Sequence, residues 1–255
     1  MSKDAILGAI RRGLKRGPLP ADEAAMLEGR IARHPRHLIP ARSRLPRPEQ
    51  VALFIKNVEK EFGTVTRLPD LTVVPEAVAE YLAAQNLPAR IVTAPHPEIE
   101  GIDWSTRPMI AREARRARDG DLVSLQHGWA GVAETGTILF PSDAARPTTL
   151  NLLPDTEIVL LRASRVVGAY EEAWDLLRAE RQDAVTGGFM PRNLMFVTGP
   201  SRSADIEQTL ELGAHGPRRL HVLLIEDEPA PRLTTPAEAR AEAVAQPGGP
   251  AAPGD

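Results

Sequence analysis

A carboxylate and two hydroxyl groups lie between two short apolar runs near the middle of the chain. The pentapeptide AETGT, residues 133–137, follows the run at 122–125 and precedes the run at 138–140, and both runs are typical of buried strands. A carboxylate at the edge of a core must pair, titrate or react, because leaving it ionised and unpartnered there costs roughly several kcal/mol. Glu134 is therefore a candidate catalytic base or nucleophile. The candidate substrate-binding residues beside it are Thr135, Gly136 and Thr137. The alternative is a structural turn in which Glu134 pairs with an arginine.

A second polar stretch follows the apolar run NLMFV at residues 193–197. The sequence TGPSRSADIE, residues 198–207, is typical of a strand, a glycine turn and the start of a helix. Free amides at a helix N-terminus favour an anion, and an arginine adds positive charge. The candidate binding residues here are Gly199, Ser201, Arg202 and Ser203.

His215 lies between two glycines in the bend LGAHGP, residues 212–217. It is a candidate catalytic acid or base, with a hydrogen-bonded structural role as the alternative. Loops that follow neighbouring parallel strands meet at the carboxyl edge of a sheet. We therefore expect Glu134, Arg202 and His215 to share one crevice, in which a small carboxylate or phosphate is the expected ligand.

Strand and helix patterns alternate through the central part of the chain. Helix 48–62 precedes strand 64–68, helix 75–86 and strand 89–93, and further strands are expected at 157–161, 193–197 and 220–225. This alternation predicts an α/β fold with a largely parallel sheet. The charged segment 111–119 is expected to line a solvated helical face.

Three regions are expected along the chain. Residues 1–47 form an N-terminal arm, with helices at 3–15 and 21–32 and a basic stretch without acids at 30–47. Residues 48–227 form the α/β domain, and residues 228–255 form a flexible tail rich in Pro and Ala.

Composition excludes several kinds of site. The 255 residues contain no cysteine, so this chain has no disulfide, catalytic thiolate, Cys-ligated zinc or Cys-ligated iron–sulfur cluster. The net charge of −3 argues against global capture by nucleic acid, and no metal-ligand spacing or phosphate-binding loop is present. The N-terminus lacks the apolar core of a signal peptide, and no segment has the ~20 apolar residues needed to span a membrane. A cytoplasmic location is expected.

The three motifs AETGT, TGPSRSADIE and LGAHGP, in this order, resemble those of the lactate-utilisation protein C family, whose members consist largely of the LUD domain. The resemblance covers about residues 50–227. It implies a three-layer, mostly parallel α/β fold related to glucosamine-phosphate deaminase, ribose-5-phosphate isomerase and CoA transferases. It also implies a cytoplasmic three-protein system that oxidises L-lactate to pyruvate. The iron–sulfur clusters of that system are expected in the two partner proteins, with no cofactor in this chain.

Two classes of function remain open from the sequence. In the first, the protein is a subunit without clusters that assembles with the iron–sulfur lactate-utilisation proteins through its N-terminal arm. In the second, it is an independent enzyme that binds a small anion, CoA or a phosphosugar and uses Glu134. Whether the chain is an enzyme is left undecided.

Overall fold

The computed structural model describes residues 2–15, 17, 19–36, 38–181, 188–204, 210–213 and 215–227. The expected tail, residues 228–255, lies outside the described residues, as do residues 205–209 of the second motif. The chain divides into two compact units, Met1–Ile39 and Pro40–Asp255. The first unit contains α1 (Lys3–Gly13) and α2 (Ala21–Arg33), which confirms the two predicted N-terminal helices.

A six-stranded parallel sheet forms the centre of the second unit. Strands that are neighbours in this sheet are separated along the sequence by the long crossover connections that parallel pairing requires. The spatial order is β1 (Thr64–Leu68), β12 (Arg219–Ile225), β7 (Thr156–Arg162), β4 (Val123–His127), β2 (Arg90–Thr93) and β3 (Ala111–Ala114). Every pairing within it is parallel, so the predicted α/β fold with a mostly parallel sheet is confirmed.

The two faces of the parallel sheet contact different layers. Ile158 and Leu160 of β7 pack on the side of α4 (Val74–Ala84) and the short α5 (Pro97–Glu100). Val159 and Leu161 of the same strand pack on the opposite side, against α3 (Arg47–Lys60). This alternation follows from the two-residue period of a strand, and both sides of β7 are apolar because both faces are covered.

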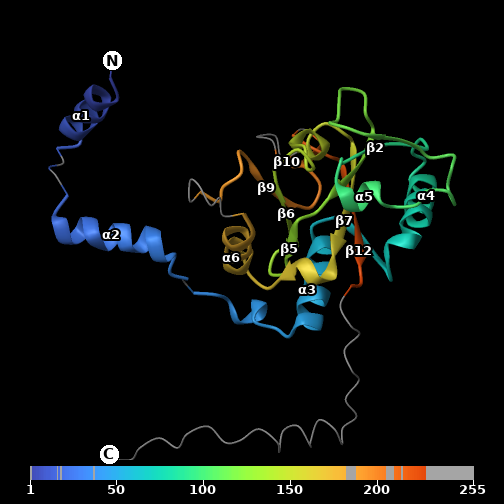
Figure 1. Ribbon diagram of the computed structural model, residues 1–255, viewed down its shortest axis with the longest axis horizontal. Helices are drawn as coiled ribbons and strands as arrows, with labels where there is room; N and C mark the ends of the chain where they lie inside the picture. Colours follow the sequence, from blue (N-terminus) through green and yellow to red (C-terminus); the bar gives the residue numbers. More distant parts are fainter. Residues whose placement is uncertain are drawn as a thin grey trace, which may run out of the picture. The chain divides into compact units, whose positions relative to one another are not determined.

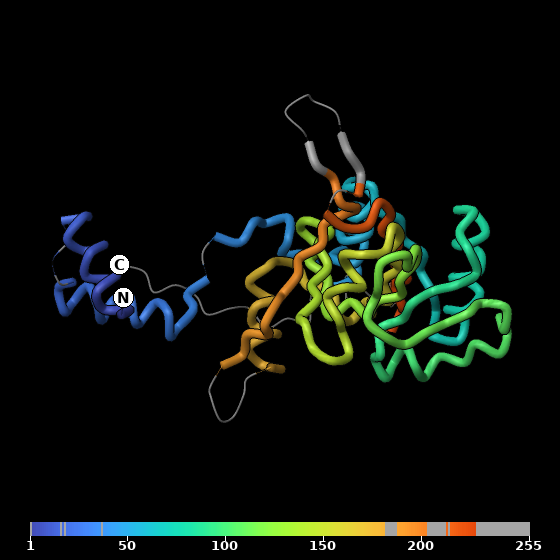
Figure 2. The backbone as a smooth tube through the Cα atoms, turned by 90° about the horizontal axis from the view of Figure 1, so that it is seen from above, coloured from blue at the N-terminus to red at the C-terminus, as the bar shows by residue number. Residues whose placement is uncertain are grey.

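A second sheet lies on the α3 side of the parallel sheet. It has the order β8 (Val166–Val167), β5 (Ala130–Val132), β6 (Thr137–Pro141) and β9 (Leu194–Thr198), and β6 pairs antiparallel with both of its neighbours. Helix α6 (Tyr170–Arg181) packs Ala173 and Leu177 against its outer face. Figures 1 and 2 both place α4 and α6 at opposite ends of this layered unit.

The residues just before α3 also belong to this unit. Ser43, in the 3₁₀ turn Ala41–Ser43, is buried, and a Cβ atom on Gly168 would lie only 2.0 Å from the Ser43 carbonyl oxygen. Arg47 donates hydrogen bonds to the carbonyl oxygens of Val166 and Ser164, the second with a length of 2.7 Å. These contacts fix the start of α3 against the loop around β8.

Two local predictions were wrong. Residues 111–114, expected within a helix, form the edge strand β3, whose exposed charges, such as those of Arg112 and Glu113, suit the solvated edge of a sheet. The expected helix start after the glycine turn is instead β10 (Arg202–Ala204), which pairs antiparallel with β11 (Leu210–Leu212). Residues 205–207, which were expected in the first turn of that helix, lie outside the described residues. None of the described helices has the length and apolar character needed to cross a membrane.

Candidate functional site

The AETGT motif forms the turn between β5 and β6. The Glu134 amide donates to the carbonyl oxygen of Gly168 at 3.1 Å, and the Gly136 amide donates to that of Val132 at 2.9 Å. Gly136 has a φ of +68°, and a Cβ atom there would lie 2.5 Å from the backbone nitrogen of Val58 in α3. The glycine is therefore required by both the backbone conformation and the close approach of the helix.

Hydroxyl groups surround this turn. The Thr137 hydroxyl is 2.7 Å from the Thr135 hydroxyl, 2.8 Å from that of Tyr170 and 2.7 Å from that of Thr198. Glu134 is half-buried, and its Oε2 is buried with no hydrogen-bond partner among the described residues. Hydrogen bonds to neighbouring residues thus hold the turn in place, whereas the Oε2 of Glu134 has no hydrogen-bond partner in the described part of the chain.

The second and third motifs meet around a cavity of about 330 Å³. Gly199, Ser201, Arg202 and His215 all line it. The Ser201 hydroxyl accepts a hydrogen bond from the His215 amide at 3.2 Å, which holds the two motifs together. His215 is exposed, and Ser203 lies in strand β10.

Arg202 is held at this cavity by the end of α3. Its Nη2 lies 2.6 Å from the Glu61 Oε2, and its guanidinium lies 4.8 Å from the centroid of the Phe62 ring. Gly199 has a φ of +71°, and a Cβ atom there would lie 2.2 Å from the Glu61 carbonyl oxygen. Because the Arg202 charge is already paired with Glu61, the arginine is anchored at the cavity by helix α3.

The cavity also contains an acid that sequence reasoning missed. Glu157, the second residue of β7, lines the cavity and is fully buried. Asn151 donates a 2.5 Å hydrogen bond to its Oε1, whereas its Oε2 has no partner among the described residues. Burial raises the pKa of Glu157 to about 8, so the side chain is a neutral acid at pH 7.

The structure brings the predicted residues together only in part. Arg202 and His215 share the cavity, but Glu134 is not among the residues that line it. The AETGT turn is nevertheless adjacent in the small sheet, because Thr137 of β6 pairs with Thr198 of β9. The reason given for their convergence was wrong. The first two loops follow β5 and β9 of the small mixed sheet, and the third follows β11, so none of them follows a strand of the six-stranded parallel sheet. Their chemical roles remain predictions.

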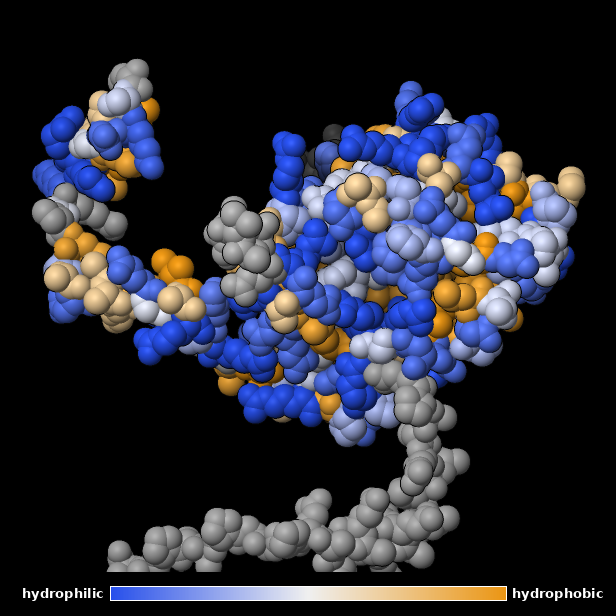
Figure 3. Space-filling model, in the orientation of Figure 1, coloured by the Kyte–Doolittle hydropathy of each residue, from blue (hydrophilic) through white to orange (hydrophobic). Residues whose placement is uncertain are grey.

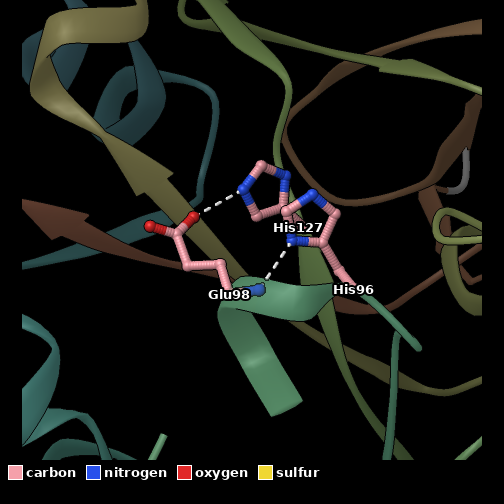
Figure 4. A group of neighbouring side chains, drawn as sticks. All are labelled: His96, Glu98 and His127. Carbon is pink, nitrogen blue, oxygen red and sulfur yellow. Dashed lines mark hydrogen bonds and ion pairs between the residues drawn. The ribbon is translucent and has the colours of Figure 1, made fainter. Parts of the chain in front are cut away.

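The carboxyl edge of the parallel sheet carries a different cluster. His96 follows β2 at the start of α5, Glu98 lies in α5, and His127 ends β4 (Figure 4). The two imidazole rings stack with centroids 3.6 Å apart, and His127 Nε2 lies 2.7 Å from Glu98 Oε2. The hydrogen bond from His127 lowers the pKa of Glu98 to about 2, and burial, with the charges of His127 and Arg146, lowers the pKa of His96 to about 4.

Two arginines extend this cluster into an ion-pair network. Arg162, the last residue of β7, donates to Glu98 Oε1 at 2.5 Å, and Arg146 lies 3.1 Å from Asp143. Burial lowers the pKa of His127. Polar residues directly after predicted strands are the sequence signal that could have identified this edge.

The three side chains His96, Glu98 and His127 could in principle hold a metal ion, because their ligand atoms lie within 4.8 Å of one another. However, the Arg146 Nη2 lies 3.0 Å from His96 Nε2 and 3.1 Å from His127 Nδ1. The Arg146 guanidinium thus lies at hydrogen-bonding distance from one ring nitrogen of each imidazole. The positive charge beside the two rings is therefore supplied by Arg146.

The chain is similar in sequence to several known proteins. The chain is 39% identical over 95 residues to an uncharacterized protein of Neisseria meningitidis, which is 37% of this chain and 38% of that one. It is 35% identical over 96 residues to lactate utilization protein C of Bacillus subtilis, which is 38% of this chain and 39% of that one. The chain thus spans about two fifths of the length of these relatives.

A solved structure covers more of the fold. The crystal structure of a DUF162 family protein from Deinococcus radiodurans is 25% identical, with a TM-score of 0.51 over 71% of this chain and 99% of that one. Residues 51–225, which include both sheets and all three motifs, match the LUD domain, and the chain therefore belongs to the LUD domain family.

Proposed function

We propose that this protein is the LUD-domain component of a cytoplasmic system that oxidises L-lactate to pyruvate, and that it acts as a subunit without clusters beside iron–sulfur partner proteins. The observation that supports the proposal is the match of residues 51–225 to the LUD domain, together with relatives named lactate utilization protein C.

The composition of the chain supports its proposed role as a subunit without iron–sulfur clusters. Iron–sulfur clusters are usually held by cysteine thiolates, and these 255 residues contain none. In the proposed system, electrons from lactate would therefore pass through clusters held by the partners. This chain would contribute assembly or ligand binding.

The N-terminal unit offers an assembly surface. The large apolar side chains of both helices and of the α1 C-cap are exposed: Ile6, Leu7 and Ile10 of α1, Leu14 at its C-cap, and Met26, Leu27 and Ile31 of α2. Figure 3 shows apolar surface on these helices. Neither helix has a buried residue. An amphipathic helix gains stability by burying its apolar face, so these faces suit contact with a partner protein.

Growth of the source organism tests the process. Deleting the gene should abolish growth on L-lactate and leave growth on pyruvate unchanged, and the intact gene should restore it. Ile10→Lys should fail to restore growth on lactate, whereas Ala5→Lys, which adds the same charge on the opposite side of α1, should restore it. Normal growth of the deletion strain on lactate would refute the proposed process.

The second candidate is an enzyme that binds a small anion, CoA or a phosphosugar and uses Glu134. The observation that favours it is the buried Oε2 of Glu134, which has no hydrogen-bond partner in the described part of the chain. Glu134→Gln preserves the size of the side chain and removes its charge. Loss of lactate growth in Glu134→Gln with unchanged protein level and unchanged partner binding would favour chemistry at Glu134, and full growth would count against it.

A further inference from the structure

The cavity formed by the second and third motifs lies between the two sheets, at the amino ends of β7 and β12. Glu157 and Leu220 line it from the parallel sheet, and Met195 and Val197 line it from β9 of the small sheet. Its volume of about 330 Å³ is at the lower end of the range for small-molecule pockets, roughly 300–1,000 Å³. The space is therefore suited to a compact organic ligand.

Glu157 leaves one hydrogen-bonding group unused in this cavity. Its Oε1 is satisfied by Asn151, but its Oε2 is buried and has no partner among the described residues. A buried polar group without a partner destabilises the folded state. A molecule in the cavity that presents an oxygen acceptor to the acid O–H would satisfy it.

The surroundings of Glu157 define what the ligand can be. On the neighbouring strands, the residues paired with Glu157 are Ser124 and Leu220, and neither carries a charge. Among the described residues, the charged or titratable side chains that line the cavity besides Glu157 are Arg202, which pairs with Glu61, and the exposed His215. The site thus combines an apolar wall, a neutral acid and an arginine that is ion-paired with Glu61.

We propose that this cavity binds a small 2-hydroxy or 2-oxo carboxylic acid, with Glu157 as the hydrogen-bond donor to one of its oxygens. Met195, Val197 and Leu220 contact the carbon chain of the ligand, and Arg202 faces its negative charge. Only the choice of this class of acid rests on the proposed function. A protonated carboxyl group kept neutral by burial can donate to an anionic or carbonyl oxygen, which an ionised one cannot.

Calorimetric titration of the whole protein with pyruvate and with L-lactate, from pH 6 to pH 9.5, tests the proposal. In the wild type, Kd should be constant at low pH and should rise about tenfold per pH unit above the pKa of Glu157. Glu157→Gln keeps a neutral donor, so it should bind the same acid without this pH dependence. Glu157→Leu removes the donor and should weaken binding at least tenfold.

The control variant is Glu226→Gln, which changes a carboxylate outside the cavity, on the segment after β12, and should bind like the wild type. Circular dichroism checks that each variant is folded. Three results would overturn the proposal. The first is that neither acid binds to the wild type at pH 6. The second is that folded Glu157→Leu binds the acid as tightly as the wild type, and the third is that Kd for Glu157→Gln depends on pH in the same way as for the wild type.

The growth experiment separates this inference from the proposed function. If lactate growth requires the protein but neither acid binds, the site is wrong and the process stands. If an acid binds with the expected pH profile but lactate growth does not require the protein, the site stands and the process is wrong.

Discussion

Replacing Glu157 with Gln should stabilise the folded protein by an amount that increases with pH. The pKa of Glu157 is raised by burial to about 8 in the folded state, against 4.5 for an exposed glutamate. A raised folded pKa means that stability is fully present below the unfolded value and is lost as pH rises towards the folded value. Each pH unit in this window costs the wild type about 1.4 kcal/mol, so the advantage of the variant should grow by about 3 kcal/mol from pH 5 to pH 7.

Urea denaturation at pH 5, 6 and 7 measures this effect. Glu157→Gln keeps the acceptor for Asn151 and nearly the same side-chain volume. The change in the transition midpoint therefore measures mainly the free-energy cost of keeping the buried Glu157 carboxyl group protonated. Glu226→Gln, at a side chain that is 41% exposed, is the matched surface control. A stability difference between wild type and Glu157→Gln that stays constant from pH 5 to pH 7 would refute a neutral buried acid at this position.

Three other changes test the remaining features. Gly136→Ala should destabilise the protein more than Gly120→Ala. Both glycines have a positive φ, but of the two only Gly136 would place a Cβ atom within 4 Å of other atoms. Equal decreases in Tm in the two variants would contradict this contact. Arg146→Ala should raise the pKa of His96 from about 4, because it removes a neighbouring cation, and an unchanged NMR titration would contradict that role. His221→Gln should reduce the loss of stability between pH 6.5 and pH 4. Burial lowers the pKa of His221 to about 4 in the folded state, so the stability that is present above pH 6.5 is lost as the pH falls. Equal acid denaturation profiles for the wild type and His221→Gln would contradict this.

The framework of the fold was predictable because the strands of a parallel sheet are nearly continuous apolar runs. The apolar run at residues 220–225 predicts a strand, and it forms most of β12. Residues 64–68 are not such a run, and they pair with it as β1. The helices on either side were equally clear from their apolar spacing. Apolar runs do not specify which sheet a strand joins, however. Residues 138–140 and 193–197 therefore could not be placed in a separate sheet, in which they pair antiparallel as β6 and β9.

The site was less predictable because burial of polar residues depends on distant segments. Glu157 precedes an apolar run, where a carboxylate usually marks the exposed start of a strand. It is buried because the 3₁₀ turn Thr148–Asn151 covers this part of the sheet, with the Ser124 hydroxyl donating to the Leu150 carbonyl oxygen at 2.8 Å. Sequence identified the residues of the second and third motifs, but the acid beside them required the tertiary structure.

The contacts of Ser43 and Arg47 also limit how far the chain can be shortened from its N-terminus. Protease cleavage before Pro40 would remove the first compact unit and leave these contacts intact. Cleavage after Arg47 would leave the carbonyl oxygens of Ser164 and Val166 without their guanidinium donor. It would also remove Ser43, whose carbonyl oxygen packs closely against Gly168. A stable proteolytic core of this protein should therefore begin between residues 37 and 42, ahead of the LUD domain match itself.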